Sequence, residues 1–353
     1  MTIIAFLVIF GVLILIHEFG HYITAKLAGV KVLEFGMGYP PRIWGFKRGE
    51  TTYSLNILPL GGFVKLLGEE DPTHPESLAG KSRWARTLVI SAGAIMNLFL
   101  ALFLFAIVFM APQKTDIGTT VITGVSENSP AAIGGLQPGD VIKKVNGRTI
   151  RNPNDLRYQY QLRLGAKATT IVERNGALMA IDVSPRWKPP EGQGPTGMQI
   201  NYRDGKVVNY REPFLTAVPH SFRQTAETLV LTRNGITKWF IGDAKPLDDI
   251  AGPIGIARVT GEVARQGSIV QLTMFAAFLS LNLAIMNILP IPALDGGRLL
   301  FIAIEFVRRG KRIPPQKEAM VHMIGFATLI AIMVIISFFD ISRIVRGENA
   351  IGG

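Results

Sequence analysis

The chain has 353 residues, of which 48% are hydrophobic and 18% charged, and its formal net charge is +11. The apolar residues are concentrated in four long runs, at 2–28, 87–111, 269–291 and about 320–339. Since about 20 apolar residues cross roughly 30 Å of hydrocarbon, this composition excludes an ordinary soluble domain and predicts four transmembrane helices. We attribute the positive charge to orientation in a lipid bilayer with anionic headgroups. No basic patch with stacking aromatics indicates a nucleic-acid partner.

Residues 1–29 are predicted to form the first transmembrane helix. Thr2–Ile16 carry no charge, and His17, Glu18 and His21 follow as an H-E-x-x-H motif. Two histidines four residues apart project from one helix face and can bind one zinc ion, with the glutamate as general base. A charge at the bilayer centre costs from about 3 to over 10 kcal/mol, so we interpret the motif as a metal site. With no cysteine in the chain, histidines and carboxylates must supply its ligands.

Charge asymmetry predicts the orientation of the helices. Lys26 and Lys31 follow the first apolar run, and no basic residue precedes it, so residue 30 is expected inside. This run has no small-residue cleavage pattern and is not a cleaved signal peptide. A second inside loop, 298–318, has six basic and two acidic side chains. The histidine pair then lies roughly 10–17 Å below the inner surface, at 1.5 Å per helical residue.

The middle of the chain is predicted to contain one membrane helix and several polar segments. A small β-sheet is expected over 30–67, dipping into the membrane interface and followed by a polar linker. The Asn175-Gly176 pair predicts a β-hairpin, and Asn152 or Asn154 caps an amphipathic helix. In chain order, the expected segments are the sheet with its linker (30–86), the second transmembrane helix (87–111), a soluble α+β module (112–186), and a linker over 187–210 with amphipathic surface helices (187–268).

The third transmembrane segment, 269–297, is predicted to be broken at Pro290 and Pro292. A broken helix within a membrane indicates a functional cavity, and Asp295 follows the break. A catalytic zinc needs three protein ligands and one open position, so Asp295 is our candidate for the third ligand; its alternative role is a helix cap. We interpret three other histidines as ordinary surface or interface residues: His74, His220 and His322. The chain is expected to end with a cytoplasmic loop (298–318), a fourth transmembrane helix (319–340) and a tail (341–353).

These features together resemble the site-2 protease family, and most closely the bacterial regulator of sigma-E protease group. The shared features are H-E-x-x-H in a first span, N-x-x-P-x-P-x-L-D-G over 287–296 in a third, and a PDZ-like module between them. This chain has Ala94 where the second span of such proteins often has proline, between Gly93 and Asn97. The resemblance implies Zn²⁺ bound by three ligands, a catalytic glutamate and an asparagine that holds substrate: His17, His21 and Asp295; Glu18; and Asn287.

The resemblance further implies an intramembrane zinc metalloendopeptidase that cleaves transmembrane segments of single-span membrane proteins. Its substrates would be anti-sigma factors already trimmed by another protease, or remnant signal peptides. The chain would be a multi-pass protein of the bacterial inner (plasma) membrane, with its PDZ-like domain outside and its active site in the cytoplasmic half of the bilayer. The alternative is a metal-binding scaffold or transporter, in which Glu18 has no special role. A soluble peptidase fits less well, because the motif continues an apolar span.

Overall fold

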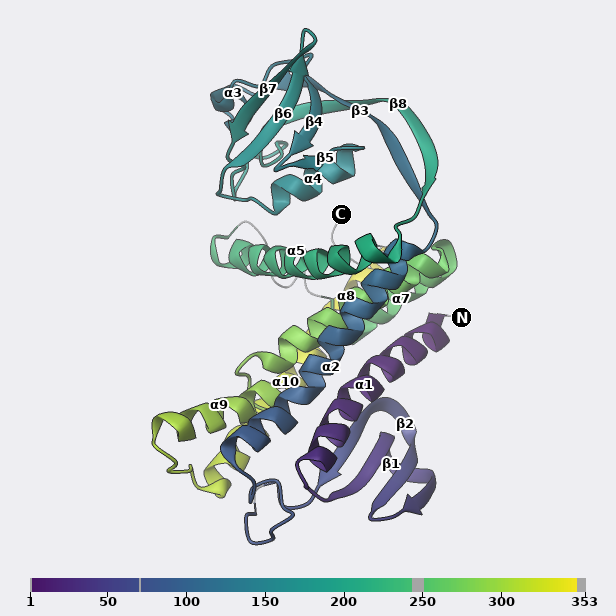
Figure 1. The fold of residues 1–353 in the computed structure, drawn as a ribbon, viewed down its shortest axis with the longest axis vertical. Helices are drawn as coiled ribbons and strands as arrows, with labels where there is room; N and C mark the ends of the chain where they lie inside the picture. Colours follow the sequence, from purple (N-terminus) through teal and green to yellow (C-terminus); the bar gives the residue numbers. More distant parts are fainter. Residues whose placement is uncertain (1, 70, 243–250, 348–353) are drawn as a thin grey trace. The chain divides into compact units, whose positions relative to one another are not determined.

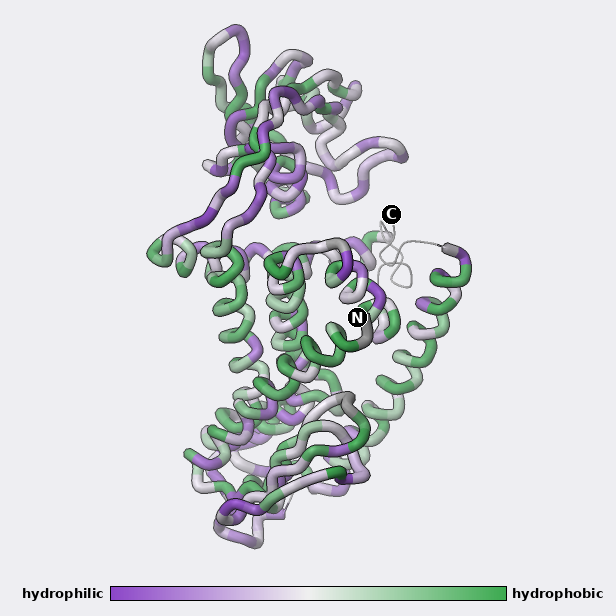
Figure 2. The backbone as a smooth tube through the Cα atoms, turned by 90° about the vertical axis from the view of Figure 1, so that its right-hand side faces the viewer, coloured by the Kyte–Doolittle hydropathy of each residue, from purple (hydrophilic) through white to green (hydrophobic). Residues whose placement is uncertain are grey.

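The computed structural model describes residues 2–69, 71–242 and 251–347 (Figure 1). The chain forms two compact units, Met1–Val108 with Ile250–Gly353, and Phe109–Asp249. Within the described residues, four helices are long and apolar enough to cross a membrane, which confirms the four predicted spans. Figure 2 shows the hydrophobic colouring that runs along these long helices. The four spans are Ile4–Leu27, Arg83–Met110, Ile269–Ile288 and Pro315–Val345.

Sequence signals explain where the helices of the first unit begin and end. Ser268 and Gln271 form a capping box at the start of α8, and the helix ends two residues before Pro290. Pro315 occupies the first position of α10, where its missing N–H has no cost. The helices of this unit are α1 (Thr2–Leu27), α2 (Arg83–Met110), α7 (Pro253–Gln266), α8 (Ile269–Ile288), α9 (Asp295–Val307) and α10 (Pro315–Val345).

The first half of the predicted cytoplasmic loop over 298–318 is helical, because α9 continues to Val307. Ile302 is buried in an apolar cluster with α1, β-strand and α2 residues, and this burial holds the helix in place. Glu305 is also buried, and the Arg86 guanidinium donates to its carboxylate at 2.6 Å. α2 begins at Arg83, one turn before the predicted boundary at 87, and Ser82 caps it by accepting a hydrogen bond from the Ala85 amide.

A curled β-hairpin follows α1 and consists of β1 (Val32–Arg48) and β2 (Thr51–Leu66). Phe35 pairs with both Tyr53 and Val64, and Gly36 pairs with both Ser54 and Phe63. The hairpin therefore folds back into four antiparallel segments, and their order across the sheet is 42–48, 51–56, 32–37 and 62–66. Within the described residues, no strand pairs with the outer side of segment 62–66. The sheet predicted over 30–67 is thus present, with a free edge at its carboxyl end.

The second unit contains an antiparallel sheet in the order β7-β6-β4-β3-β8, with β5 paired to β4. Asn152 caps α4, and β6 and β7 turn at Asn175-Gly176, as the sequence predicted. Its buried core comes from both helices and strands, including Ile122, Leu156 and Val172. The elements are β3 (Gln113–Val125), α3 (Pro130–Gly134), β4 (Val141–Val145), β5 (Arg148–Thr149), α4 (Pro153–Gln161), β6 (Ala168–Arg174), β7 (Ala177–Val183), β8 (Met198–Tyr210) and α5 (Phe214–Phe240).

The predicted linker over 187–210 is wrong for its second half, because β8 pairs with β3 along almost its whole length. The pair Asp204-Gly205 has the composition of a turn. In the structure these two residues form an irregularity opposite Gly118, where the register shifts, and Asp204 adopts a φ of 56°. A bulge of this kind bends a strand without ending it, so the local sequence signal was misleading.

Candidate metal centre

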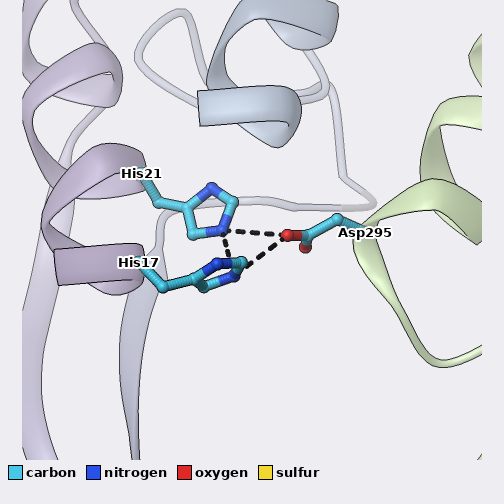
Figure 3. Close-up of side chains that lie close together, drawn as sticks. All are labelled: His17, His21 and Asp295. Atoms are coloured by element: carbon cyan, nitrogen blue, oxygen red, sulfur yellow. Dashed lines mark hydrogen bonds and ion pairs between the residues drawn. The ribbon is translucent and has the colours of Figure 1, made fainter. Parts of the chain in front are cut away.

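The two histidines of the motif lie one helical turn apart on α1 and face the same side (Figure 3). Their Nε2 atoms are 3.2 Å apart. The His17 ring and the Asp295 side chain retain only 12% and 19% exposure. The helix thus presents two imidazole nitrogens side by side in a largely buried position within the first unit.

Asp295 comes to this position from the first residue of α9 (Figure 3). The segment 289–294 between α8 and α9 is non-helical, as Pro290 and Pro292 predict. Gly296 and Gly297 let the chain turn tightly, because a Cβ on Gly297 would lie 2.6 Å from the Ile291 carbonyl oxygen and one on Gly296 would overlap α8 backbone. The Asp295 Oδ2 atom lies 3.1 Å from His17 Nε2 and 3.2 Å from His21 Nε2.

This donor set fits zinc. Ligand atoms around a tetrahedral ion with bonds of about 2.0–2.1 Å are separated by roughly 3.3 Å, and the three observed separations are 3.1–3.2 Å. Asp295 Oδ2 is buried and lies within ion-pair distance of both Nε2 atoms, so the three atoms can share one metal ion. Gly93 of α2 leaves open the space beside the rings, since a Cβ there would lie 2.6 Å from His17 Nε2.

Hydrogen bonds from α2 orient both rings. His21 Nδ1 lies 2.8 Å from the Val89 carbonyl oxygen, so this nitrogen carries the hydrogen and leaves Nε2 free as a ligand. His17 Nδ1 lies 3.4 Å from the Asn97 side-chain amide, whose Oδ1 is buried without a partner. With this amide turned by 180°, its oxygen accepts a hydrogen bond from His17 Nδ1–H, which leaves Nε2 of His17 free as a ligand.

A cavity of about 480 Å³ adjoins the three ligand atoms. Glu18 lines it together with the ligands, and the free edge of β2 forms another wall through Gly62, Phe63 and Val64. Gly62 approaches the Glu18 side chain so closely that a Cβ would lie 3.2 Å from its Cγ. The cavity therefore brings together the Glu18 carboxylate, the three side chains that could hold a metal ion and a strand edge with no paired strand within the described residues.

The remaining sequence candidates lie outside the three-residue cluster. His74 accepts a hydrogen bond from the Glu76 amide, and His220 pairs with Glu212 at 2.8 Å. The Asn287 amide donates to the Leu283 carbonyl oxygen within α8 at 3.0 Å, so its substrate-binding role stays a prediction.

His322 of α10 lines the cavity and accepts from the Ala293 amide, a contact that sequence reasoning missed. The sequence signal that could have indicated this contact is the one that pointed to His17, namely a histidine within an otherwise apolar span.

The fold and this site define a polytopic membrane metalloprotease. The model of Peptidase family M50 matches residues 5–332, and the chain belongs to this family. A protein of Clostridium acetobutylicum whose name describes a zinc metalloprotease is 35% identical over 333 residues, which cover 94% of this chain and 95% of the relative. The regulator of sigma-W protease RasP of Bacillus subtilis is 31% identical, covering 97% and 99%. Zinc metalloprotease RasP of Geobacillus kaustophilus is 30% identical, covering 97% and 98%. The chain is accordingly a zinc metalloprotease, and zinc is its cofactor.

Proposed function

We propose that this metalloprotease cleaves peptide bonds inside the transmembrane segments of other membrane proteins. In this proposal His17, His21 and Asp295 hold the zinc ion and Glu18 is the general base. The observation that carries it is the convergence of two imidazole nitrogens and one carboxylate oxygen, within 3.2 Å of one another, at a helix that is otherwise apolar.

In the proposed reaction, each residue of the site has a separate role. Zinc, when bound, polarises the scissile carbonyl group and lowers the pKa of water toward about 7. Glu18 takes a proton from the attacking water and then gives it to the leaving amine. Val89, through its carbonyl oxygen, fixes the ring of His21 in the tautomer that leaves Nε2 free. Asn97 is the group placed to do the same for His17.

The free edge of β2 supports a way of binding substrate. A helical substrate hides its peptide bonds, so it must unwind before cleavage, and an extended segment can then add to an exposed sheet edge through main-chain hydrogen bonds. Segment 62–66 offers such an edge, and Gly62, Phe63 and Val64 line the cavity that contains Glu18. Asn287 would hold the substrate backbone nearby.

The wider arrangement in the membrane belongs to the same proposal. Exposed apolar side chains on the hairpin, among them Ile43, Trp44 and Ile57, support contact with the lipid interface on the cytoplasmic side. The active site then lies in the cytoplasmic half of the bacterial inner membrane. The antiparallel sheet of the second unit, with its short helices α3 and α4, acts as a PDZ-like filter outside. Anti-sigma factors trimmed beforehand and remnant signal peptides are the proposed substrates.

Substitution of Glu18 by glutamine tests the chemistry. The glutamine keeps the shape of the side chain but cannot accept the proton, so cleavage of a membrane-embedded single-span reporter should fall at least about 100-fold. Zinc content of the purified protein should remain at the wild-type level.

Glu50→Gln is the matched control, because Glu50 is half exposed and makes only a 3.8 Å contact with Lys31. It should cleave at the wild-type rate. A Glu18→Gln protein that retains zinc and cleaves as fast as the wild type would contradict the proposed mechanism.

A further inference from the structure

The segment 289–294 leads directly into Asp295, the proposed third ligand, and has few internal supports. Two of its short hydrogen bonds run from the Ile291 amide to the Leu289 carbonyl and from the Leu294 amide to the Ile291 carbonyl. Ala293, two residues before Asp295, adopts a φ of 77°, a left-handed conformation that is unusual for a residue with a side chain. A metal ligand that directly follows such a segment needs external contacts to hold its position.

His322 on α10 supplies one of these contacts. Its Nδ1 atom accepts a hydrogen bond from the Ala293 backbone N–H at 3.0 Å. The ring also packs on Phe301 of α9, with ring centroids 5.5 Å apart. A buried backbone N–H without an acceptor costs free energy comparable to a lost hydrogen bond, so the imidazole favours the left-handed conformation at Ala293. The ring thereby links the segment before Asp295 to the helix that begins with it.

Gly325 supplies the second contact, one helical turn further along the same face of α10. A Cβ on Gly325 would lie 2.9 Å from the carbonyl carbon and oxygen of Pro292 and closer still to its side chain. The helix can therefore approach the backbone of this segment only because residue 325 has no side chain. His322 and Gly325 touch consecutive residues, Ala293 and Pro292, from one helix.

We infer that His322 is a positioning residue, which together with Gly325 fixes the segment 289–294 and so holds Asp295 at the metal. The hydrogen bond determines the tautomer of His322: Nδ1 accepts, so the hydrogen lies on Nε2, which is buried and has no partner within the described residues. The His322 ring is not one of the three clustered ligands, and its effect on zinc runs through Asp295. This inference rests on the proposed ligand set.

The test measures zinc affinity of the full-length protein in detergent by competition with a chelator, with thermal unfolding recorded in parallel. His322→Phe keeps a ring but removes the acceptor, and should weaken zinc binding about 10-fold or more, as is usual when a residue that orients a ligand is lost. His322→Asn places an amide oxygen where Nδ1 lies and should restore affinity to within about 3-fold of the wild type. Gly325→Ala should weaken binding as His322→Phe does.

His74→Phe is the matched control, because His74 Nδ1 also accepts a backbone hydrogen bond, from Glu76 at 3.1 Å, in an exposed segment. It should leave zinc affinity unchanged. A folded His322→Phe protein with wild-type zinc affinity overturns the inference, and so does a His322→Asn protein no better than His322→Phe. Should His322→Phe fail to fold, the other two variants test the inference: wild-type zinc affinity in a folded Gly325→Ala protein, or an affinity in His322→Asn more than about 3-fold below that of the wild type, would overturn it. A wild-type protein that binds no zinc would instead refute the ligand set itself.

Discussion

Replacing Gly93 by alanine tests whether the metal centre needs the open space beside the two histidine rings, at a residue outside the two sequence motifs. Gly93 lies on α2, and the Cβ of an alanine there would come 2.6 Å from both Cε1 and Nε2 of His17 and closer still to His21 Nε2. Helices α1 and α2 already touch at this level, since a Cβ on Gly20 of α1 would meet the Ala92 backbone. The new methyl group would therefore compete for the space beside the two ligand nitrogens.

The size of the effect follows from these distances. Ordinary van der Waals contact begins at 3.4 Å, so the His17 ring or the helix must shift by about 0.8 Å, and the His21 ring by more. Metal–ligand distances tolerate only about 0.2 Å, and we expect zinc affinity to fall at least about 10-fold, with a comparable or larger loss of peptidase activity. Alanine is the better helix former by up to about 1 kcal/mol, so helix stability should not fall for local reasons.

Chelator competition measures the zinc dissociation constant, and circular dichroism during heating measures stability. The matched control is Gly11→Ala on α1, where the nearest atom to a new Cβ is the flexible end of Met37 at 3.1 Å. It should bind zinc like the wild type. A folded Gly93→Ala protein with wild-type zinc affinity would contradict the predicted steric conflict at the two imidazoles.

Three further changes probe the ligand set, its support and the second unit. Asp295→Ala should reduce zinc to a small fraction of the wild-type content, measured by metal analysis, because it removes one of three ligand atoms. Asn97→Leu should weaken zinc binding about 10-fold in the chelator assay, because the His17 ring loses the side-chain amide that lies beside its Nδ1. Asp140→Asn should destabilise the second unit by roughly 2–4 kcal/mol, detected by amide hydrogen exchange, because the buried carboxylate accepts from Arg174 at 2.6 and 2.7 Å. Burial raises the pKa of Asp140, but the hydrogen bonds from Arg174 and the Gln137 amide outweigh it and hold this pKa below its ordinary value. The stabilisation is therefore complete above about pH 4 and lost as the pH falls from there through the lowered pKa.

Each of these predictions has an outcome that contradicts it. Full zinc occupancy in Asp295→Ala would show that Asp295 is not a zinc ligand. Unchanged zinc affinity in Asn97→Leu would show that the Asn97 amide does not support the site. For Asp140, the control is Asp182→Asn, whose partner Lys167 is 78% exposed and lies 3.7 Å away; it should change stability by less than about 1 kcal/mol. Equal losses of stability in Asp140→Asn and Asp182→Asn would show that the buried ion pair contributes no more to stability than the exposed one.

Local patterns predicted the elements that depend on nearest neighbours along the chain. The proline pair ended α8, Asn152 capped α4, and Asn175-Gly176 formed a hairpin turn. Elements that depend on distant partners were missed. β8 contains a turn-like Asp204-Gly205 pair and is paired with β3. α9 continues into the predicted cytoplasmic loop, where Ile302 is buried and Arg86, over 200 residues away in the chain, pairs with Glu305.

Local sequence patterns were enough to predict the four apolar spans, the spacing of His17 and His21 on one helix face, and the break before Asp295. These follow from composition, helical periodicity and the missing N–H of proline, all of which act over a few residues. The folded chain was needed to show that Asp295 meets the two imidazoles, that Gly93 keeps their surroundings open, and that His322 bonds to the segment before Asp295. Each of these contacts joins separate helices, and their close packing is a property of the folded chain that no local pattern encodes.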